Sequence, residues 1–199
     1  QADVRIGNRP REDGVVGRLE QVGAFGKINP PMREIQDQQA LWQALNDGTI
    51  DVIATDHAPH TLEEKGYARN IDGSLLMHSG SMYEQSHAGL PLIQHSLLLM
   101  LHYVKQGRIT IEKVVEKMSH AVATCFQISD RGFIREGYYA DLVIVDLKEQ
   151  TVADKDNVLY KCGWSPLEGF TFPASVTHTF VNGNLVYGNG RWDESQMGL

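Results

Sequence analysis

Cysteine is nearly missing from this 199-residue chain, whose two copies, Cys125 and Cys162, lie far apart without a CxxC spacing. This scarcity argues against a disulfide framework or a thiolate zinc site, and it favours a reducing cytoplasm. Long apolar runs are missing as well, because no window approaches the roughly 18 apolar residues of a membrane span. No secretory signal pattern opens the chain. We therefore expect a cytoplasmic protein that does not enter a membrane.

Positive charge is also scarce, since 18 Lys and Arg stand against 25 Asp and Glu, for a formal net charge of −7. Without a basic stripe to displace counterions, a nucleic-acid partner is not expected. The hydrophobic share of 42% and the charged share of 22% are typical of a folded domain with a real core. Because the chain begins with Gln1 rather than Met, we expect it to be a piece of a longer protein.

An α/β pattern occupies the first two thirds of the chain. Residues 34–46 have helical spacing and are followed by Gly48, a typical helix stop. The β-branched run 50–55 predicts a short buried strand that ends in the polar residues 56–60. This order of helix, strand and polar loop is typical of a TIM-type barrel, and since a whole barrel needs about 250 residues we expect only its last units.

The later part of the chain changes from helix to strand. Residues 61–90 show no periodicity, which predicts an active-site loop or lid. An apolar helix is expected over 92–104 and another after Thr110. A strand over 141–146 and a hairpin on the Asn-Gly turn 182–183 predict a small β module near the end.

The segment 56–60, Asp-His-Ala-Pro-His, is the densest candidate for chemistry. An aspartate at the end of a buried strand is partly desolvated, and a metal ion is the usual compensation. Such an Asp56 can carry protons to and from reacting groups, and His60, beyond the stiff Pro59, can face an anionic substrate group. In the alternative interpretation Asp56 caps a helix and both histidines are ordinary loop residues. The residues alone leave both interpretations open.

A second candidate is the segment 27–31, Lys-Ile-Asn-Pro-Pro. The two prolines keep Asn29 out of a helix, and its side-chain amide can pair with an amide or imide substrate. The alternative is a simple turn. Elsewhere we expect Glu63 and Glu64 to lie in a solvated loop, and His95 to be a core or interface histidine.

Together these motifs resemble the C-terminal half of a dihydroorotase, a family of the amidohydrolase superfamily. The likeness covers about residues 25–199. It is carried by Lys27–Pro31, Asp51–His60, Gly132–Asp146, Asn157–Glu168 and Val181–Gly183.

The resemblance implies the fold and domain organisation. Residues 25–130 would form the last part of a TIM-type (β/α)8 barrel, with 61–90 as the active-site loop. Residues 131–199 would form part of a small β-sandwich module and the C-terminal tail. Residues 1–24 match nothing that the family places before the Asn-Pro motif.

The resemblance also implies roles for single residues. Asp56 would be a ligand of the zinc site and the general base, then general acid, of the reaction. Asn29 would bind the substrate, His60 would hold the substrate carboxylate, and Ala88 and Gly89 would bind the substrate ring through the main chain.

The implied activity is the reversible conversion of N-carbamoyl-L-aspartate and dihydroorotate in pyrimidine biosynthesis, with one or two zinc ions. The family's other metal ligands have no counterpart here, since no histidine precedes His57. Two alternatives stay open: a related cyclic amidase of the allantoinase or hydantoinase type, and a non-catalytic scaffold subunit that binds a transcarbamoylase. The expected partners are a small-molecule substrate and either a second copy of the chain or a transcarbamoylase.

One prediction follows from the missing ligands. The purified 199-residue chain should neither retain stoichiometric zinc nor turn over dihydroorotate, because a single aspartate cannot complete a tetrahedral site. Elemental analysis after dialysis, together with a turnover assay, checks this. Tight stoichiometric zinc with turnover would contradict it.

Overall fold

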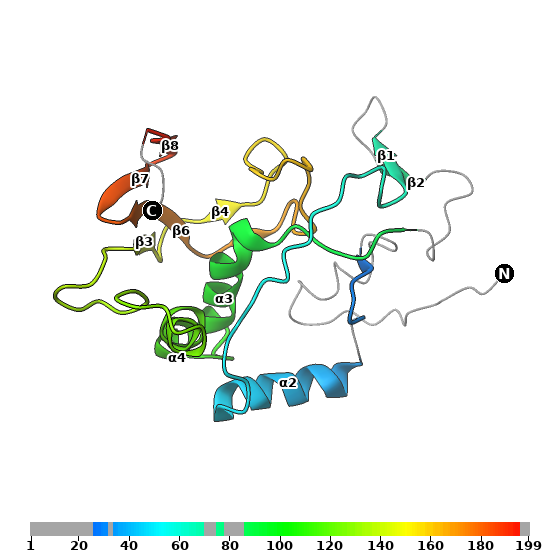
Figure 1. Cartoon of the computed structure of the whole chain (residues 1–199). Helices are drawn as coiled ribbons and strands as arrows, with labels where there is room; N and C mark the ends of the chain where they lie inside the picture. Colours follow the sequence, from blue (N-terminus) through cyan, green and yellow to red (C-terminus); the bar gives the residue numbers. More distant parts are fainter. Residues whose placement is uncertain (1–25, 32–33, 70–74, 78–85, 196–199) are drawn as a thin grey trace. The chain divides into compact units, whose positions relative to one another are not determined.

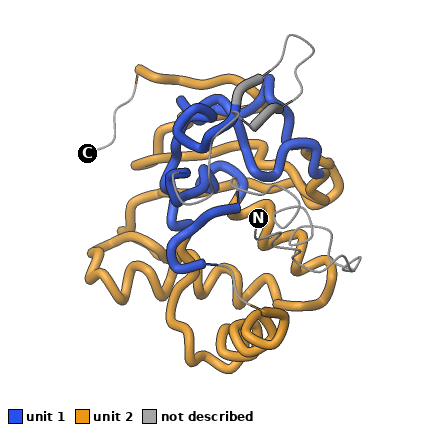
Figure 2. Tube along the Cα trace, turned by 90° about the vertical axis from the view of Figure 1, so that its right-hand side faces the viewer, with its two compact units in different colours: residues 1–32, 55–95, 152–170 blue, residues 33–54, 96–151, 171–199 orange. Residues whose placement is uncertain are grey.

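The computed structural model describes residues 26–31, 34–69, 75–77 and 86–195. The chain divides into two compact units, each assembled from three stretches of sequence (Figure 2). So far as they are described, residues 1–32, 55–95 and 152–170 make unit 1, and residues 33–54, 96–151 and 171–199 make unit 2. Helices and strands both occur, which confirms an α/β composition (Figure 1). No described helix is long and apolar enough to cross a membrane.

The first described helix, α2, spans Ile35–Asp47, as its spacing predicts. Its start is capped reciprocally: the Glu34 side chain accepts from the main chain of Asp37, and the Glu34 main-chain N–H donates to the Asp37 carboxylate. Gly48 then ends it in the left-handed conformation with φ 93°, which glycine adopts without steric cost.

Two further helical stretches follow the prediction closely. A 3-10 turn, η3 (Ile93–His95), leads into α3 (Ser96–Lys105). Thr110 caps the next stretch by accepting a hydrogen bond from the Lys113 N–H at 3.2 Å. That stretch consists of α4 (Ile111–Val115), the π-helical turn η4 (Glu116–His120) and α5 (Ala121–Cys125).

The core of unit 2 is apolar and comes from these helices. Trp42 packs edge-on against Tyr103 with ring centroids 4.7 Å apart. Ile53 joins the same cluster through partial burial, and its N–H donates to the Lys117 carbonyl at 3.0 Å. The fully buried members of the cluster are Leu45, Met100, Tyr103, Ile109 and Val114.

An antiparallel sheet forms the β part of unit 2 (Figure 1). Its strand order is β3 (Leu142–Asp146), β6 (Ser175–Val181), β7 (Asn184–Gly188) and β8 (Arg191–Trp192). Strands β4 (Thr151–Val152) and β5 (Thr171–Phe172) form a separate pair.

The predicted hairpin joins β6 to β7. Asn182 and Gly183 both have positive φ, 52° and 82°, which is the type I′ geometry expected of an Asn-Gly turn. The Arg131 guanidinium fixes this turn by pairing with Asp141 and by donating to the Asn182 side chain.

The structure corrects two expectations about strands. Residues 50–56 do not form a strand and are not buried. A strand needs a continuous row of hydrogen bonds to a neighbouring strand. In the described part of the chain residues 50–56 pair with no strand: the Ile53 N–H donates to the Lys117 carbonyl, and the isolated parallel bridge beside the segment joins His57 to Leu90. Conversely, the stretch 61–90 contains an antiparallel pair, β1 (Tyr67–Arg69) and β2 (Leu75–Met77). Strands of three residues are too short to give a periodic signal, so the sequence did not indicate them.

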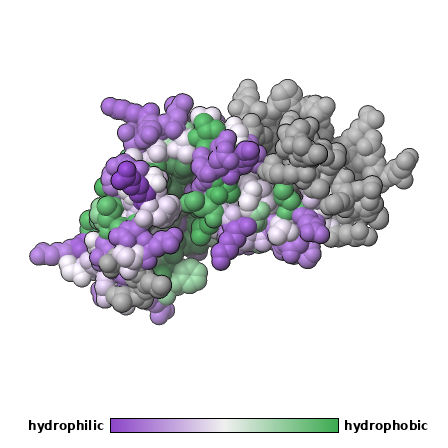
Figure 3. Space-filling model, turned by 90° about the horizontal axis from the view of Figure 1, so that it is seen from above, coloured by the Kyte–Doolittle hydropathy of each residue, from purple (hydrophilic) through white to green (hydrophobic). Residues whose placement is uncertain are grey.

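Several large apolar side chains are open to solvent, and green hydrophobic groups accordingly show between polar ones in Figure 3. Ile134 is 88% exposed and Phe126 is 68% exposed. These two residues lie outside the helices and strands, and single exposed apolar residues are common on folded proteins.

A matched pair of leucines on α2 tests the core assignment. Leu45 is 8% exposed, whereas Leu41 is 59% exposed on the same helix. Leu45→Ala should lower the free energy of unfolding by about 2–5 kcal/mol, because it leaves a cavity in the core. Leu41→Ala should change it by less than about 0.5 kcal/mol. Urea unfolding followed by circular dichroism measures both, and equal effects would contradict the assignment.

Candidate functional site

Asp56 has an unusual backbone. Its φ of 46° lies in the left-handed region, although the residue is not glycine. Such a conformation costs on the order of 1–3 kcal/mol for most residues, and strain of this kind concentrates at functional sites. The side chain is exposed. Aspartate tolerates this conformation better than most residues do, and from it Asp56 presents its carboxylate to solvent.

His57 holds this segment to residues 90–93. Its Nδ1 accepts hydrogen bonds from the main-chain N–H of Leu92 at 3.0 Å and of Ile93 at 3.3 Å. Alongside, the Ala58 N–H donates to the Leu90 carbonyl at 3.1 Å. Because Nδ1 is an acceptor, the ring proton belongs on Nε2. His57 thus has a structural role in the site.

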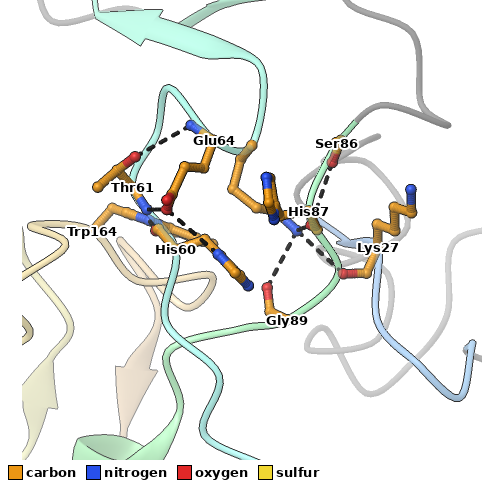
Figure 4. Close-up of polar contacts among 9 residues, drawn as sticks. Lys27, His60, Thr61, Glu64, Ser86, His87, Gly89 and Trp164 are labelled. Carbon is orange, nitrogen blue, oxygen red and sulfur yellow. Dashed lines mark hydrogen bonds and ion pairs between the residues drawn. The ribbon is translucent and has the colours of Figure 1, made fainter.

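His60 is oriented by a carboxylate on the next turn of chain (Figure 4). Its Nδ1 lies 3.4 Å from Glu64 Oε2. The Glu64 carboxylate also accepts from the Thr61 N–H at 2.8 Å, and the Thr61 hydroxyl accepts from the Glu64 N–H at 3.2 Å. The hydrogen bond from the Thr61 N–H is the main cause that lowers the pKa of Glu64, and the neighbouring His60 lowers it further. Glu64 lies in a solvated loop, as expected, and in addition it bonds to Thr61 and His60.

A second imidazole lies beside the first. The rings of His60 and His87 are 4.9 Å apart between centroids and inclined by 35° (Figure 4). His60 is 25% exposed and His87 is an exposed residue, so solvent reaches both. Two imidazoles with exposed ring atoms are suitable donors for an anionic group when they are protonated.

Gly89 allows two segments of unit 1 to approach each other closely. A Cβ at this position would lie 2.5 Å from the Ala58 carbonyl oxygen, and the φ of 140° is also unfavourable for other residues. Its N–H donates to the Lys27 carbonyl at 2.9 Å. The predicted loop at Ala88 and Gly89 thus lies against the start of the segment that carries Asn29, an exposed residue. The Gly89 N–H therefore already has a protein partner, and substrate contacts at Ala88 and Gly89 stay a prediction.

Lys65 joins the same segments and was not indicated by the sequence. Its side chain is fully buried, and its Nζ donates to the carbonyls of Lys27 at 3.1 Å, His87 at 2.8 Å and Gly89 at 3.2 Å. Burial, and secondarily the charge of Lys27, lowers its pKa from 10.5 to about 8. A lysine after two glutamates in a polar stretch has the pattern of a solvated surface, so no local signal distinguishes it.

Residues 157–165 contact the Asp-His-Ala-Pro-His motif through Trp164 and Tyr160. The indole N–H of Trp164 donates to the His60 carbonyl at 2.7 Å, across 104 positions of sequence (Figure 4). Tyr160 packs against the His57 ring with centroids 5.2 Å apart, and its hydroxyl accepts from the Gln94 N–H at 2.9 Å. Burial raises the pKa of Tyr160 to about 12, so it remains a neutral phenol.

A metal fits the described residues only in part. Asp56 is a suitable ligand, but among the described residues no three His, Cys, Asp or Glu side chains are grouped so that they could hold an ion. A structural or catalytic zinc needs three or four protein ligands. The described residues therefore do not make a complete zinc site.

Comparison with known proteins defines the class. Residues 28–186 match the model of the amidohydrolase family, and the chain belongs to this family. It is 39% identical over 162 residues to a dihydroorotase of Acetivibrio thermocellus, covering 81% of this chain and 35% of that protein. It is 36% identical over 160 residues to a dihydroorotase of Pyrococcus horikoshii, covering 80% of this chain and 33% of that protein. The chain thus spans about a third of the length of these curated relatives.

Solved structures of hydantoinases are also similar to this chain. An L-hydantoinase (dihydropyrimidinase) from Arthrobacter aurescens superposes with a TM-score of 0.73 at 28% identity, covering 89% of this chain and 38% of that one. A D-hydantoinase (dihydropyrimidinase) from Thermus sp. gives 0.72 at 25% identity, covering 89% and 37%. Both similarities extend over nearly all of this chain.

His95 makes the stability of unit 1 dependent on pH. It is 1% exposed, its Nδ1 lies 3.3 Å from the Ser165 hydroxyl, and its ring packs edge-on against Tyr160. This burial confirms the expectation of a core histidine. It also lowers the pKa of His95 from 6.5 to about 4. The unfolded chain therefore binds the extra proton first as the pH falls.

We predict that the free energy of unfolding falls by on the order of 3 kcal/mol between pH 6.5 and pH 4, because His95 stays neutral only in the folded chain. His95→Gln should lose this dependence on pH, whatever its effect at neutral pH. His102→Gln, a change at a half-buried histidine on the neighbouring helix, should keep it. Urea titrations at several pH values measure the slopes, and identical slopes in all three proteins would contradict the assignment.

Proposed function

We propose that this chain supplies the proton-transfer and anion-binding side of the active site of a cyclic amide hydrolase that interconverts N-carbamoyl-L-aspartate and dihydroorotate in pyrimidine biosynthesis. The observation that carries the proposal is the position of His60, four residues after Asp56 and oriented by Glu64. The relatives named dihydroorotase, at 36–39% identity, support it further.

The chemistry assigns one task to each residue. Hydrolysis forms a bond between water oxygen and the ring carbonyl carbon, and it breaks the bond from that carbon to the ring nitrogen. The Asp56 carboxylate takes a proton from the water and returns it to the departing nitrogen. His60 binds the substrate carboxylate by a charge-assisted hydrogen bond, and the Asn29 amide and the main chain at Ala88 bind the ring amide groups.

The remaining implications of the family are part of the same proposal. Residues 25–130 would end a TIM-type barrel with 61–90 as its active-site loop, and residues 131–199 would belong to a β-sandwich module. Zinc is the cofactor that the resemblance implies, with Asp56 as one ligand. Since the described residues do not complete a zinc site, no step above depends on it. The low cysteine content supports a cytoplasmic location.

The likeness to hydantoinase structures supports a second candidate, a cyclic amidase for rings without an exocyclic carboxylate. The two candidates differ in what His60 must do. A ring without the carboxylate offers no anion to this imidazole, so its binding should not depend on His60.

A chimaera tests the proposal, because the chain covers only a third of its relatives. Residues 28–186 would replace the matching part of the Acetivibrio thermocellus dihydroorotase. Asp56→Asn in the chimaera should lower kcat by about 100-fold or more, since the amide keeps the shape and cannot carry the proton. His60→Ala should raise KM for dihydroorotate about tenfold or more, because a hydrogen bond to a charged group is lost.

Glu63→Gln is the matched control, a change of an exposed carboxylate in the same loop that should leave both constants unchanged. Dihydroorotate turnover that is insensitive to His60→Ala would contradict the carboxylate assignment. Hydrolysis of hydantoins but not of dihydroorotate by the chimaera would favour the second candidate.

A further inference from the structure

Lys65 is a charged group at the meeting point of three segments. It follows the Asp-His-Ala-Pro-His motif by five positions, and its side chain is 0% exposed. Its three hydrogen bonds reach back to Lys27 and forward to His87 and Gly89, at sequence separations of 38, 22 and 24. Lys27 lies two positions before Asn29, and His87 and Gly89 flank Ala88. The three bonded residues are therefore next to predicted substrate contacts in the sequence.

The geometry requires the charged form of the side chain. An ammonium has three N–H donors and no acceptor, and each donor here has one carbonyl oxygen within 3.2 Å. A neutral amine has only two N–H groups, so its lone pair would face one of the carbonyls. Burial lowers the pKa of Lys65 only to about 8, so the charge is still present at pH 7.

Burying this charge opposes folding, since an ammonium loses its hydration and its three partners in the described structure are neutral carbonyls. An apolar side chain would fill the same space without that cost. The ammonium therefore adds something that packing alone does not: three directional bonds that radiate to separate parts of the backbone. Because all three N–H groups are used and the side chain is buried, Lys65 does not contact a substrate.

We infer that Lys65 is a positioning residue whose ammonium ties residues 27–29 and 87–89 to the loop 60–65, and thereby sets how Asn29, Ala88 and His60 face a common ligand. The role in substrate binding rests on the proposed function. The ordering of the backbone by Lys65 is independent of the proposed function, and it can be measured without any ligand.

Hydrogen exchange in the ligand-free 199-residue chain tests the ordering. The reporter is the Gly89 N–H, which bonds to the Lys27 carbonyl and not to Lys65 itself. The reference is the Ile53 N–H in unit 2, bonded to the Lys117 carbonyl. Lys65→Met should speed Gly89 exchange about tenfold or more and leave Ile53 within about twofold. Lys65→Arg, which keeps charge and donors, should restore part of the protection.

A spectroscopic signature needs no variant, which matters if Lys65→Met fails to fold. In the wild-type chain at pH 6 the Lys65 ammonium protons should exchange slowly enough to give a resolved NMR signal coupled to the carbonyl carbons of Lys27, His87 and Gly89. An ammonium signal that exchanges as fast as that of an exposed lysine would overturn the inference. So would unchanged Gly89 exchange in Lys65→Met, or equal acceleration of Gly89 and Ile53.

Binding of dihydroorotate to the chimaera described above tests the role of Lys65 in substrate binding. Lys65→Met should weaken this binding about tenfold, whereas Glu63→Gln should leave it unchanged. Affinity that is unaltered in Lys65→Met would overturn the substrate-positioning role. If the chimaera neither binds nor turns over dihydroorotate while Gly89 exchange in the 199-residue chain still responds as expected, the proposed function fails and the positioning of the backbone by Lys65 stands.

Discussion

The close approach of residues 87–90 to residues 57–60 is the constraint on which the candidate site depends. It is possible because Gly89 has no side chain, since any Cβ there would collide with the Ala58 carbonyl oxygen. The bridge between His57 and Leu90 keeps the two segments parallel at that point. Each predicted binding residue in this part of the chain lies within a few positions of the contact, so its backbone is placed by the same packing.

Long-range polar bonds surround an apolar cluster at the site. Among the described residues, the buried members of this cluster are Tyr67, Leu90 and Trp164. Around it, Lys65, His57 and the Trp164 indole each bond to main-chain groups far away in sequence. Directional bonds of this kind fix backbone geometry more narrowly than apolar contacts do, which suits the recognition of planar ring amides that we propose for this site.

The electrostatic pattern of the site agrees with a carboxylate-bearing substrate. His60 and His87 offer imidazoles, and Glu64 fixes one ring nitrogen of His60. Asp56, the proposed proton carrier, lies four residues before His60 with a backbone conformation that is rare outside glycine. Membership of the amidohydrolase family places this arrangement in a class of hydrolases, and the dihydroorotase relatives make the particular ring chemistry the natural proposal.

The sequence by itself determined the features that arise within a few residues. Helix α2 with its stop at Gly48, the Thr110 cap and the turn at 182–183 follow from local spacing and backbone preference, and all three were predicted. Tertiary structure alone decided the rest. Among the described residues, segment 50–56 has no neighbouring strand to pair with, and Lys65 is buried only because carbonyls from 22 to 38 positions away converge on it. Local sequence patterns do not indicate such long-range partners, because these are brought close only by folding.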